Sequence, residues 1–248
     1  MTEEKMPTAL VEDLVGFCTN RAHVYAFLSR CYEAEIDADY AKQIVEHFSF
    51  AADNAVLTSE IAAMKEALVA LDEAQLEQLA VVFNRVFFGM GPRTAQKAFP
   101  YESVYTSEGG CLMQDAYSEI VKVYRDALVR KNPDFPEPED HLAIELAFMQ
   151  SLCERCVAAL QEGVEAPVVA LLEEQRTFIA SHLLNWIALF FADMKGYAKS
   201  FCAAMHRRLR KFAAGKGNKL LPARVGVLAH HRRFCPPTAQ RTTAHASS

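Results

Sequence analysis

Residues 137–141, Glu-Pro-Glu-Asp-His, bring three carboxylates and one imidazole together within five positions, directly before an apolar run that starts at Leu142. Carboxylates at the start of a helix bind free backbone amides and favour the positive end of the helix dipole. Clustered carboxylates also pair with arginine, whose guanidinium binds a carboxylate through two parallel hydrogen bonds. These residue types therefore fit either a helix start or an anion-rich pocket for arginine side chains.

A metal or acid–base site at Asp140 and His141 is a third interpretation. A helix N-terminus should keep His141 neutral, which suits a ligand role. Helical di-metal sites, however, use Glu-x-x-His pairs, and none of the eight histidines lies three residues after a glutamate. The sequence also lacks the phosphate-binding, dinucleotide-binding and nucleophile-elbow glycine motifs. The alternative that stays open is a small helical nucleotide- or metal-dependent hydrolase centred on these two residues.

A second group of polar and aromatic side chains lies at residues 100–105, "PYESVY". It belongs to a stretch rich in glycine and proline, residues 89–111, which is longer than most loops in compact domains. Its aromatic residues indicate an ordered segment. The stretch fits a packed connector, or an apolar rim with a few polar groups, as in many recognition sites. The candidate binding residues here are Pro100, Tyr101, Glu102, Ser103 and Tyr105.

Apolar residues spaced by three and four predict that helices position both groups. The expected helices cover residues 14–32, 39–52, 58–71, 73–88, 113–131, 167–192 and 195–213, with a capping box formed by Asp72 and Gln75. A further core helix is expected to start near Pro138 and to end at Gly163. No segment shows the alternation typical of a strand. The predicted fold class is all-α: a single-domain bundle of about eight or more helices, with a long ordered loop between its N- and C-terminal halves.

Charge is divided unevenly along the chain. Residues 194–248 hold 12 of the 26 basic residues and none of the 31 acidic ones, leaving 14 basic against 31 acidic residues, a net charge of −17, in residues 1–193. An acidic body argues against nucleic acid and favours a basic peptide or protein as the partner. Residues 214–248 show little periodicity. We therefore expect a helical domain at 1–213 and a disordered basic extension at 214–248.

Cysteine usage and hydropathy predict a cytoplasmic protein. The seven cysteines are odd in number and scattered, which is typical of reduced thiols, and the pair Cys153 and Cys156 lies in a helical apolar stripe. The first residues lack the features of a secretory signal, and the longest apolar run, "LLNWIALFFADM", is too short to span a bilayer. We expect no stable membrane association.

Two motifs in this order resemble the TorD/DmsD/NarJ family of molybdoenzyme maturation chaperones, the redox enzyme maturation proteins, and most closely its TorD/DmsD branch. They are "FNRVFFGMGPRTAQKAFPYESVY" and "EPEDH". The segments "RAHVYAFLSRCYEA" and "FIASHLLNWIALFFADMKGYAKSFCAAM" also resemble the first and the late helices of that family. The resemblance covers residues 16–212.

The resemblance implies an all-helical cytoplasmic chaperone that is not an enzyme. Such proteins bind the twin-arginine signal peptide, the body, or both, of a molybdopterin-containing oxidoreductase, here of the DMSO/TMAO reductase class, and delay its export until the cofactor is inserted. Some members bind guanine nucleotide weakly; no other cofactor is implied. The family's peptide-binding motifs correspond here to Glu137, Pro138, Asp140 and His141, and to Pro100, Tyr101, Glu102 and Ser103. The protein is expected to be a monomer or a homodimer.

A receptor for two adjacent arginines followed by an apolar segment needs carboxylates beside an apolar groove. Glu139 and its neighbours supply the carboxylates, while Tyr105 and the first-helix residues Tyr25 and Leu28 supply apolar surface. Exposed charge pairs contribute only about 0.2 to 1 kcal/mol each, so affinity should come mainly from apolar burial. A scaffold that binds only the body of a reductase and ignores its signal is a further hypothesis.

Overall fold

The computed structural model describes residues 6–48, 55–90, 97–163 and 165–197. Within these ranges the regular structure is helical, and the one β-type pairing is an isolated antiparallel bridge between Tyr101 and His141. The prediction of an all-α fold is confirmed. The predicted boundary at residue 213 and the basic extension lie outside the described residues.

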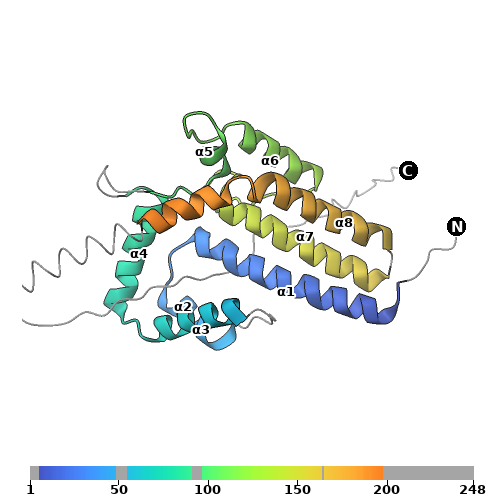
Figure 1. Cartoon of the computed structure of the whole chain (residues 1–248), viewed down its shortest axis with the longest axis horizontal. Helices are drawn as coiled ribbons and strands as arrows, with labels where there is room; N and C mark the ends of the chain where they lie inside the picture. Colours follow the sequence, from blue (N-terminus) through green and yellow to red (C-terminus); the bar gives the residue numbers. More distant parts are fainter. Residues whose placement is uncertain (1–5, 49–54, 91–96, 164, 198–248) are drawn as a thin grey trace, which may run out of the picture.

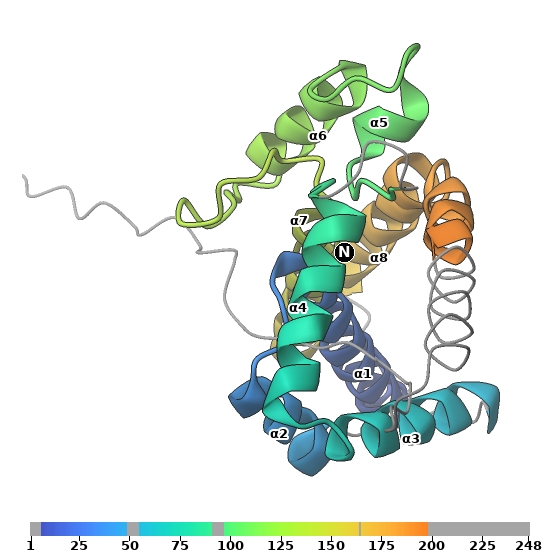
Figure 2. The ribbon, with the colours of Figure 1, turned by 90° about the vertical axis from the view of Figure 1, so that its left-hand side faces the viewer.

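Three long helices run side by side through the molecule (Figure 1). They are α1 (Thr8–Glu33), α7 (Leu142–Glu162) and α8 (Glu165–Phe178). Figure 2 shows α4 (Glu73–Phe87) leading from the pair α2 (Ala38–His47) and α3 (Ala55–Val69) at one end of the molecule to the region of α5 (Glu102–Thr106) and α6 (Asp115–Asp126) at the other. The remaining described elements are the π-helical turn η1 (Ile179–Leu183) and a helix over Ile187–Tyr197.

The main core surrounds α7, which lies between α1 and α8. Phe148, Met149, Leu152 and Cys156 on this helix have no exposed surface. A smaller core lies where α2 and α3 meet the end of α1, around Ile44. Because α7 is buried along most of its length, the polar groups at its N-terminal end are also drawn into the interior.

Several helix ends match the sequence signals. The capping box of α4 is present: Asp72 Oδ1 accepts a hydrogen bond from the Gln75 amide at 2.8 Å, and Gln75 Oε1 accepts one from the Asp72 amide at 2.9 Å. Helix α7 ends as predicted at Gly163, which has the left-handed φ of 76° that glycine adopts without strain. It begins at Leu142 and not near Pro138, where the proline pattern placed its start.

The predicted helix over residues 167–192 is interrupted. Helix α8 ends at Phe178, the next five residues form the π-helical turn, and a new helix begins at Ile187 after a turn. The Trp186 indole donates to the His182 carbonyl oxygen at 2.6 Å, so a side chain takes part in the hydrogen bonding of the break. Trp186 and Phe190 are both fully buried, which explains why apolar spacing alone did not reveal the interruption.

The predicted helix over residues 113–131 is shorter, because α6 ends at Asp126 and Leu128 adopts a left-handed φ of 57°. Most of the predicted helix over residues 195–213 lies outside the described residues. In the described part of the chain, no single helix has the length and apolar content to cross a membrane. One pair of consecutive helical segments, Glu165–Leu183 and Ile187–Tyr197, has enough length and apolar content to cross a membrane when the two are taken together. The pair is, however, bent by 50° at the break between them.

Candidate functional site

The two motifs singled out in the sequence meet in space. The amide of Leu142 donates to the Pro100 carbonyl at 2.8 Å, and the amide of Glu102 donates to the Asp140 carbonyl at 3.0 Å. These bonds flank the Tyr101–His141 bridge. We call residues 100–103 together with 140–142 the α5–α7 joint.

The Asp140 side chain connects the two segments of the joint by hydrogen bonds. Its Oδ2 accepts a hydrogen bond from the Ser103 amide at 3.0 Å and a second from the Ser103 hydroxyl. The same hydroxyl oxygen accepts from the Met113 amide at 3.1 Å. Asp140 and Ser103 have no exposed surface. Asp140 therefore binds the α5 segment and does not cap α7, contrary to the expectation that the carboxylates of this stretch would hold the first amides of the helix.

His141 is the N-cap of α7. Its Nδ1 accepts a hydrogen bond from the Ala143 amide at 3.1 Å, which requires Nδ1 to be unprotonated. Burial, and secondarily the positive charge of Lys131, lower the pKa of His141 to about 3. The imidazole lies edge-on to the rings of Tyr101 and Phe135. His141 is thus a neutral, buried capping group.

Glu102 connects the joint to the break after α8. Its Oε2 lies 3.0 Å from His182 Nδ1, and its Oε1 accepts a hydrogen bond from the Asn185 side chain at 2.5 Å. Tyr105 adds to this connection by stacking on Trp186, with ring centres 5.5 Å apart. Sequence reasoning missed His182 and Asn185, because no local pattern relates them to a glutamate about 80 positions away.

Glu145, on the first turn of α7, is also buried in this region, and sequence reasoning treated it only as part of a helix. Burial raises the pKa of Glu145 well above its ordinary value, and the carboxylates of Glu102 and Asp140 raise it further. Glu145 is therefore held as the neutral acid.

The rim of the joint retains the partly exposed groups of the motif. The Tyr101 hydroxyl donates to Glu137 Oε2 at 2.5 Å, while Lys131 Nζ donates to the Glu137 carbonyl and lies 3.6 Å from Glu139 Oε1. Pro138 is likewise partly exposed. The expected open cluster of carboxylates is not what the structure shows: Asp140 and His141 are turned inward, and both rim glutamates already have partners. The peptide-binding role of these residues stays a prediction.

The first helix lies next to the joint, as the predicted groove requires. The Ser29 hydroxyl donates to the Ala143 carbonyl in the first turn of α7 at 2.6 Å. Tyr25 and Leu28 are partly buried and pack on the main core, and the Tyr25 hydroxyl accepts from Arg21 at 3.3 Å. Most of their apolar surface therefore already contacts the protein itself.

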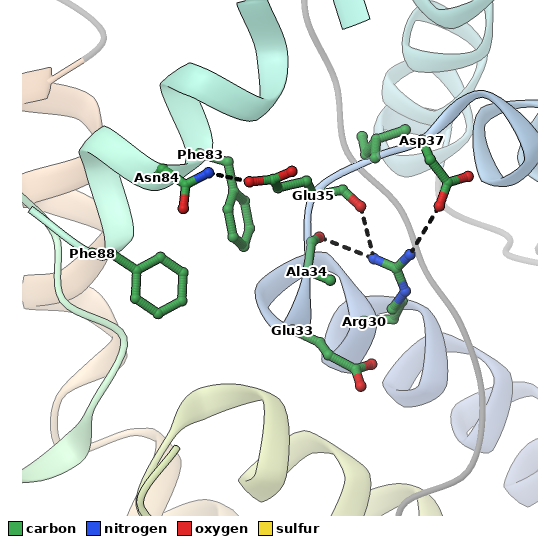
Figure 3. Close-up of a pocket in the computed structure, with 9 residues that line it drawn as sticks. Arg30, Glu33, Ala34, Glu35, Asp37, Phe83, Asn84 and Phe88 are labelled. Carbon is green, nitrogen blue, oxygen red and sulfur yellow. Dashed lines mark hydrogen bonds and ion pairs between the residues drawn. The ribbon is translucent and has the colours of Figure 1, made fainter. Parts of the chain in front are cut away.

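A pocket of about 390 Å³ opens between the end of α1, the α1–α2 connection and α4 (Figure 3). Its apolar walls include Phe83 and Phe88. Its polar groups are largely engaged: Glu35 accepts a hydrogen bond from Asn84, and Asp37 lies 4.0 Å from the Arg30 guanidinium, which also donates to two backbone carbonyls. The remaining lining residues are Glu33, Ala34 and Ile36.

The hydrolase alternative at Asp140 and His141 is wrong. Both side chains are fully buried, and the imidazole nitrogen that could act as a base already accepts a backbone hydrogen bond. Among the residues that the structure describes, no group of three or more His, Cys, Asp or Glu side chains is arranged to hold a metal ion.

Known proteins are similar to this chain in sequence. The model of the family "Nitrate reductase delta subunit" matches residues 51–192. The chaperone protein TorD of Vibrio cholerae is 31% identical over 190 residues, covering 73% of this chain and 82% of that protein. TorD of Photobacterium profundum is 29% identical over 193 residues, covering 75% of this chain and 86% of that protein.

A crystal structure described as that of a redox enzyme maturation protein from Archaeoglobus fulgidus is also similar. It is 18% identical, with a TM-score of 0.36, and covers 63% of this chain and 92% of that one. The named curated relatives are chaperones, which confirms the prediction that this chain is not an enzyme. The chain belongs to the nitrate reductase delta subunit family, together with the TorD chaperones.

Proposed function

We propose that this protein is a cytoplasmic chaperone for the maturation of a molybdopterin-containing oxidoreductase of the DMSO/TMAO reductase class. It binds the twin-arginine signal peptide of the precursor, assists cofactor insertion and delays export until the enzyme is complete. The observation that carries the proposal is the 31% identity to a TorD chaperone over 190 residues, a length that includes both motifs of the α5–α7 joint.

Charge supports a basic ligand. The net charge of −17 over residues 1–193 attracts cationic segments over distances comparable to the screening length, about 8 Å at physiological salt. At the surface of the joint, Glu137 and Glu139 are partly exposed, and their partners include the Tyr101 hydroxyl and the Lys131 ammonium group. An arginine guanidinium, with five N–H donors, can compete with either partner.

The apolar part of a signal peptide needs an apolar surface close to these charges. The pocket between α1 and α4 lies near the joint, since Arg30 on its wall directly follows Ser29, which touches the first turn of α7. Its walls of Phe83 and Phe88 would accept one large apolar side chain. The signal would then place its arginines at the joint and an apolar residue in the pocket.

Binding of a reductase precursor, with and without its signal peptide, tests the proposal. The full precursor should bind the immobilised chaperone, and deletion of the signal should weaken binding at least tenfold. Equal binding of both forms would show a scaffold that recognises the body alone. Binding of neither form by folded chaperone would contradict the proposal.

A further inference from the structure

Several buried polar atoms of the α5–α7 joint and of the first turn of α7 have no hydrogen-bond partner among the residues that the structure describes. They are Asp140 Oδ1, His141 Nε2 and both carboxyl oxygens of Glu145. All three residues have 0% exposed surface. Glu102 and Asp140 lie close enough to Glu145 to influence its ionisation, so the three acids form one buried cluster. We call Glu102, Asp140 and Glu145 the buried acid cluster.

Buried polar atoms normally find partners, because an unpaired group has lost its water without replacement. In this cluster most of the unpaired atoms are carboxyl oxygens, which can accept several hydrogen bonds once they are ionised. The ligand chemistry that supplies many donors and a positive charge in one group is the guanidinium of arginine. In the closed joint no such group can reach these oxygens.

The α5 segment, residues 100–113, carries Glu102 of the buried acid cluster and contacts Asp140 through Ser103. Its outer contacts are the bonds from Glu102 to His182 and Asn185, and those of Tyr105 with Trp186 and Asp193. Beyond α5 the chain passes through left-handed positions at Gly109, Gly110 and Met113. A left-handed φ is strained for a residue such as Met113, and that side chain is 56% exposed. Strain of this kind often marks a segment that changes conformation.

We propose that the α5 segment is a cover latched by the contacts of Glu102 with His182 and Asn185, and that the buried acid cluster receives a client arginine once this latch opens. The inference rests on the proposed function and specifies how its site is controlled. The closed form keeps the acids away from other cations. Client affinity is then reduced by the fraction of molecules that are open.

Asn185 offers the most direct way to weaken the latch, because the residue lies at the surface and donates only one of the bonds to Glu102. Asn185→Ala removes that donor, and Asn185→Asp replaces it with a carboxylate of nearly the same shape. In both variants we expect the amides of Glu102 and Ser103 to exchange hydrogen about five- to tenfold faster, with the larger effect for Asp. Gln150→Ala, which removes an exposed bond to Glu154, is the matched control and should leave this exchange unchanged.

Trp186 reports the position of the cover in the wild-type chain, since it is the only tryptophan and is buried against Tyr105. A synthetic peptide with two adjacent arginines and a following apolar segment should increase quenching of its fluorescence by acrylamide. The Asn185 variants should bind that peptide about five- to tenfold more tightly than the wild type.

Unchanged amide exchange in both Asn185 variants, or unchanged peptide affinity with Trp186 still protected in the complex, would overturn the cover while leaving peptide binding intact. Failure of the wild-type chain to bind the peptide would instead contradict the proposed function. The exchange measurements on the free variants would still decide whether the latch exists, because they need no ligand.

Discussion

His141 and Glu145 are both held uncharged at the start of α7, although these residue types commonly ionise in water. Burial is the main cause in each case, and it moves the two pKa values in opposite directions because it disfavours a positive imidazolium and a negative carboxylate alike. The two residues should therefore make opposite contributions to the dependence of stability on pH.

Glu145 should destabilise the protein progressively as the pH rises. Its pKa in the folded state is raised, so above about pH 4.5 the unfolded chain loses the proton that the folded chain keeps. The free energy of unfolding then falls by up to about 1.4 kcal/mol per pH unit until the folded group ionises. Glu145→Gln should remove this slope, as measured by urea unfolding between pH 5 and 8. Parallel curves for variant and wild type would contradict a neutral Glu145.

His141 should act in the acid range. Its pKa of about 3 in the folded state lies below the ordinary 6.5, so between these values only the unfolded chain takes up the proton. Stability is present above pH 6.5 and is lost as the pH falls, by up to about 1.4 kcal/mol per unit. His141→Asn keeps an N-cap acceptor and should flatten this loss when unfolding is followed from pH 7 to 4. A wild type whose stability is unchanged over that range would exclude the neutral cap.

Part of the site could be predicted from the sequence at the level of single residues. Sequence reasoning identified the two motifs, and the structure brings Tyr101, Ser103, Asp140 and His141 into one joint. Sequence reasoning placed the polar groups of Asp140 and His141 at the surface. Local spacing does not show that Asp140 will accept hydrogen bonds from Ser103, or that the start of α7 is buried. The partners of Glu102 come from a distant break in a helix, which no local pattern identifies.

At the scale of elements, helix ends with local chemistry were predicted well. The capping box of α4 and the glycine after α7 each depend on residues within a few positions, so the sequence contains the full signal. The break after α8 contains a local bond from the Trp186 indole to the His182 carbonyl and a bond from Asn185 to Glu102 across the fold, and apolar periodicity continues through it. Long-range packing therefore decides where the predicted pattern fails.

Substitution by alanine should change the free energy of unfolding in opposite directions at two glycines, one after a helix and one inside a helix. Gly163 ends α7 with a φ of 76°, a conformation that strains any residue with a Cβ, so Gly163→Ala should lower the free energy of unfolding by about 1 kcal/mol. Gly16 lies inside α1 with open space where a Cβ would stand, so Gly16→Ala should raise it by about 0.5 to 1 kcal/mol. Urea unfolding of both variants measures these changes. Destabilisation by both would show that the conformation of Gly163 is not the cause.

At the scale of the whole molecule, three long helices provide a rigid frame and hold the joint at one end of it (Figure 1). The acidic charge is spread over this helical body, whereas the groups that would contact a client lie around α5 and the start of α7. In the proposed function, long-range charge would attract a basic segment, and the closed joint would restrict which segment can bind. Both properties fit a chaperone that recognises a client through a short cationic signal.

Calorimetric titration of the folded chain with a twin-arginine signal peptide and with its Lys-Lys counterpart measures whether the protein recognises paired arginines. We expect measurable binding of the arginine peptide and at least tenfold weaker binding of the lysine peptide, because only guanidinium offers paired donors to a carboxylate. Equal affinity for the two peptides, or no heat with either, would contradict this expectation.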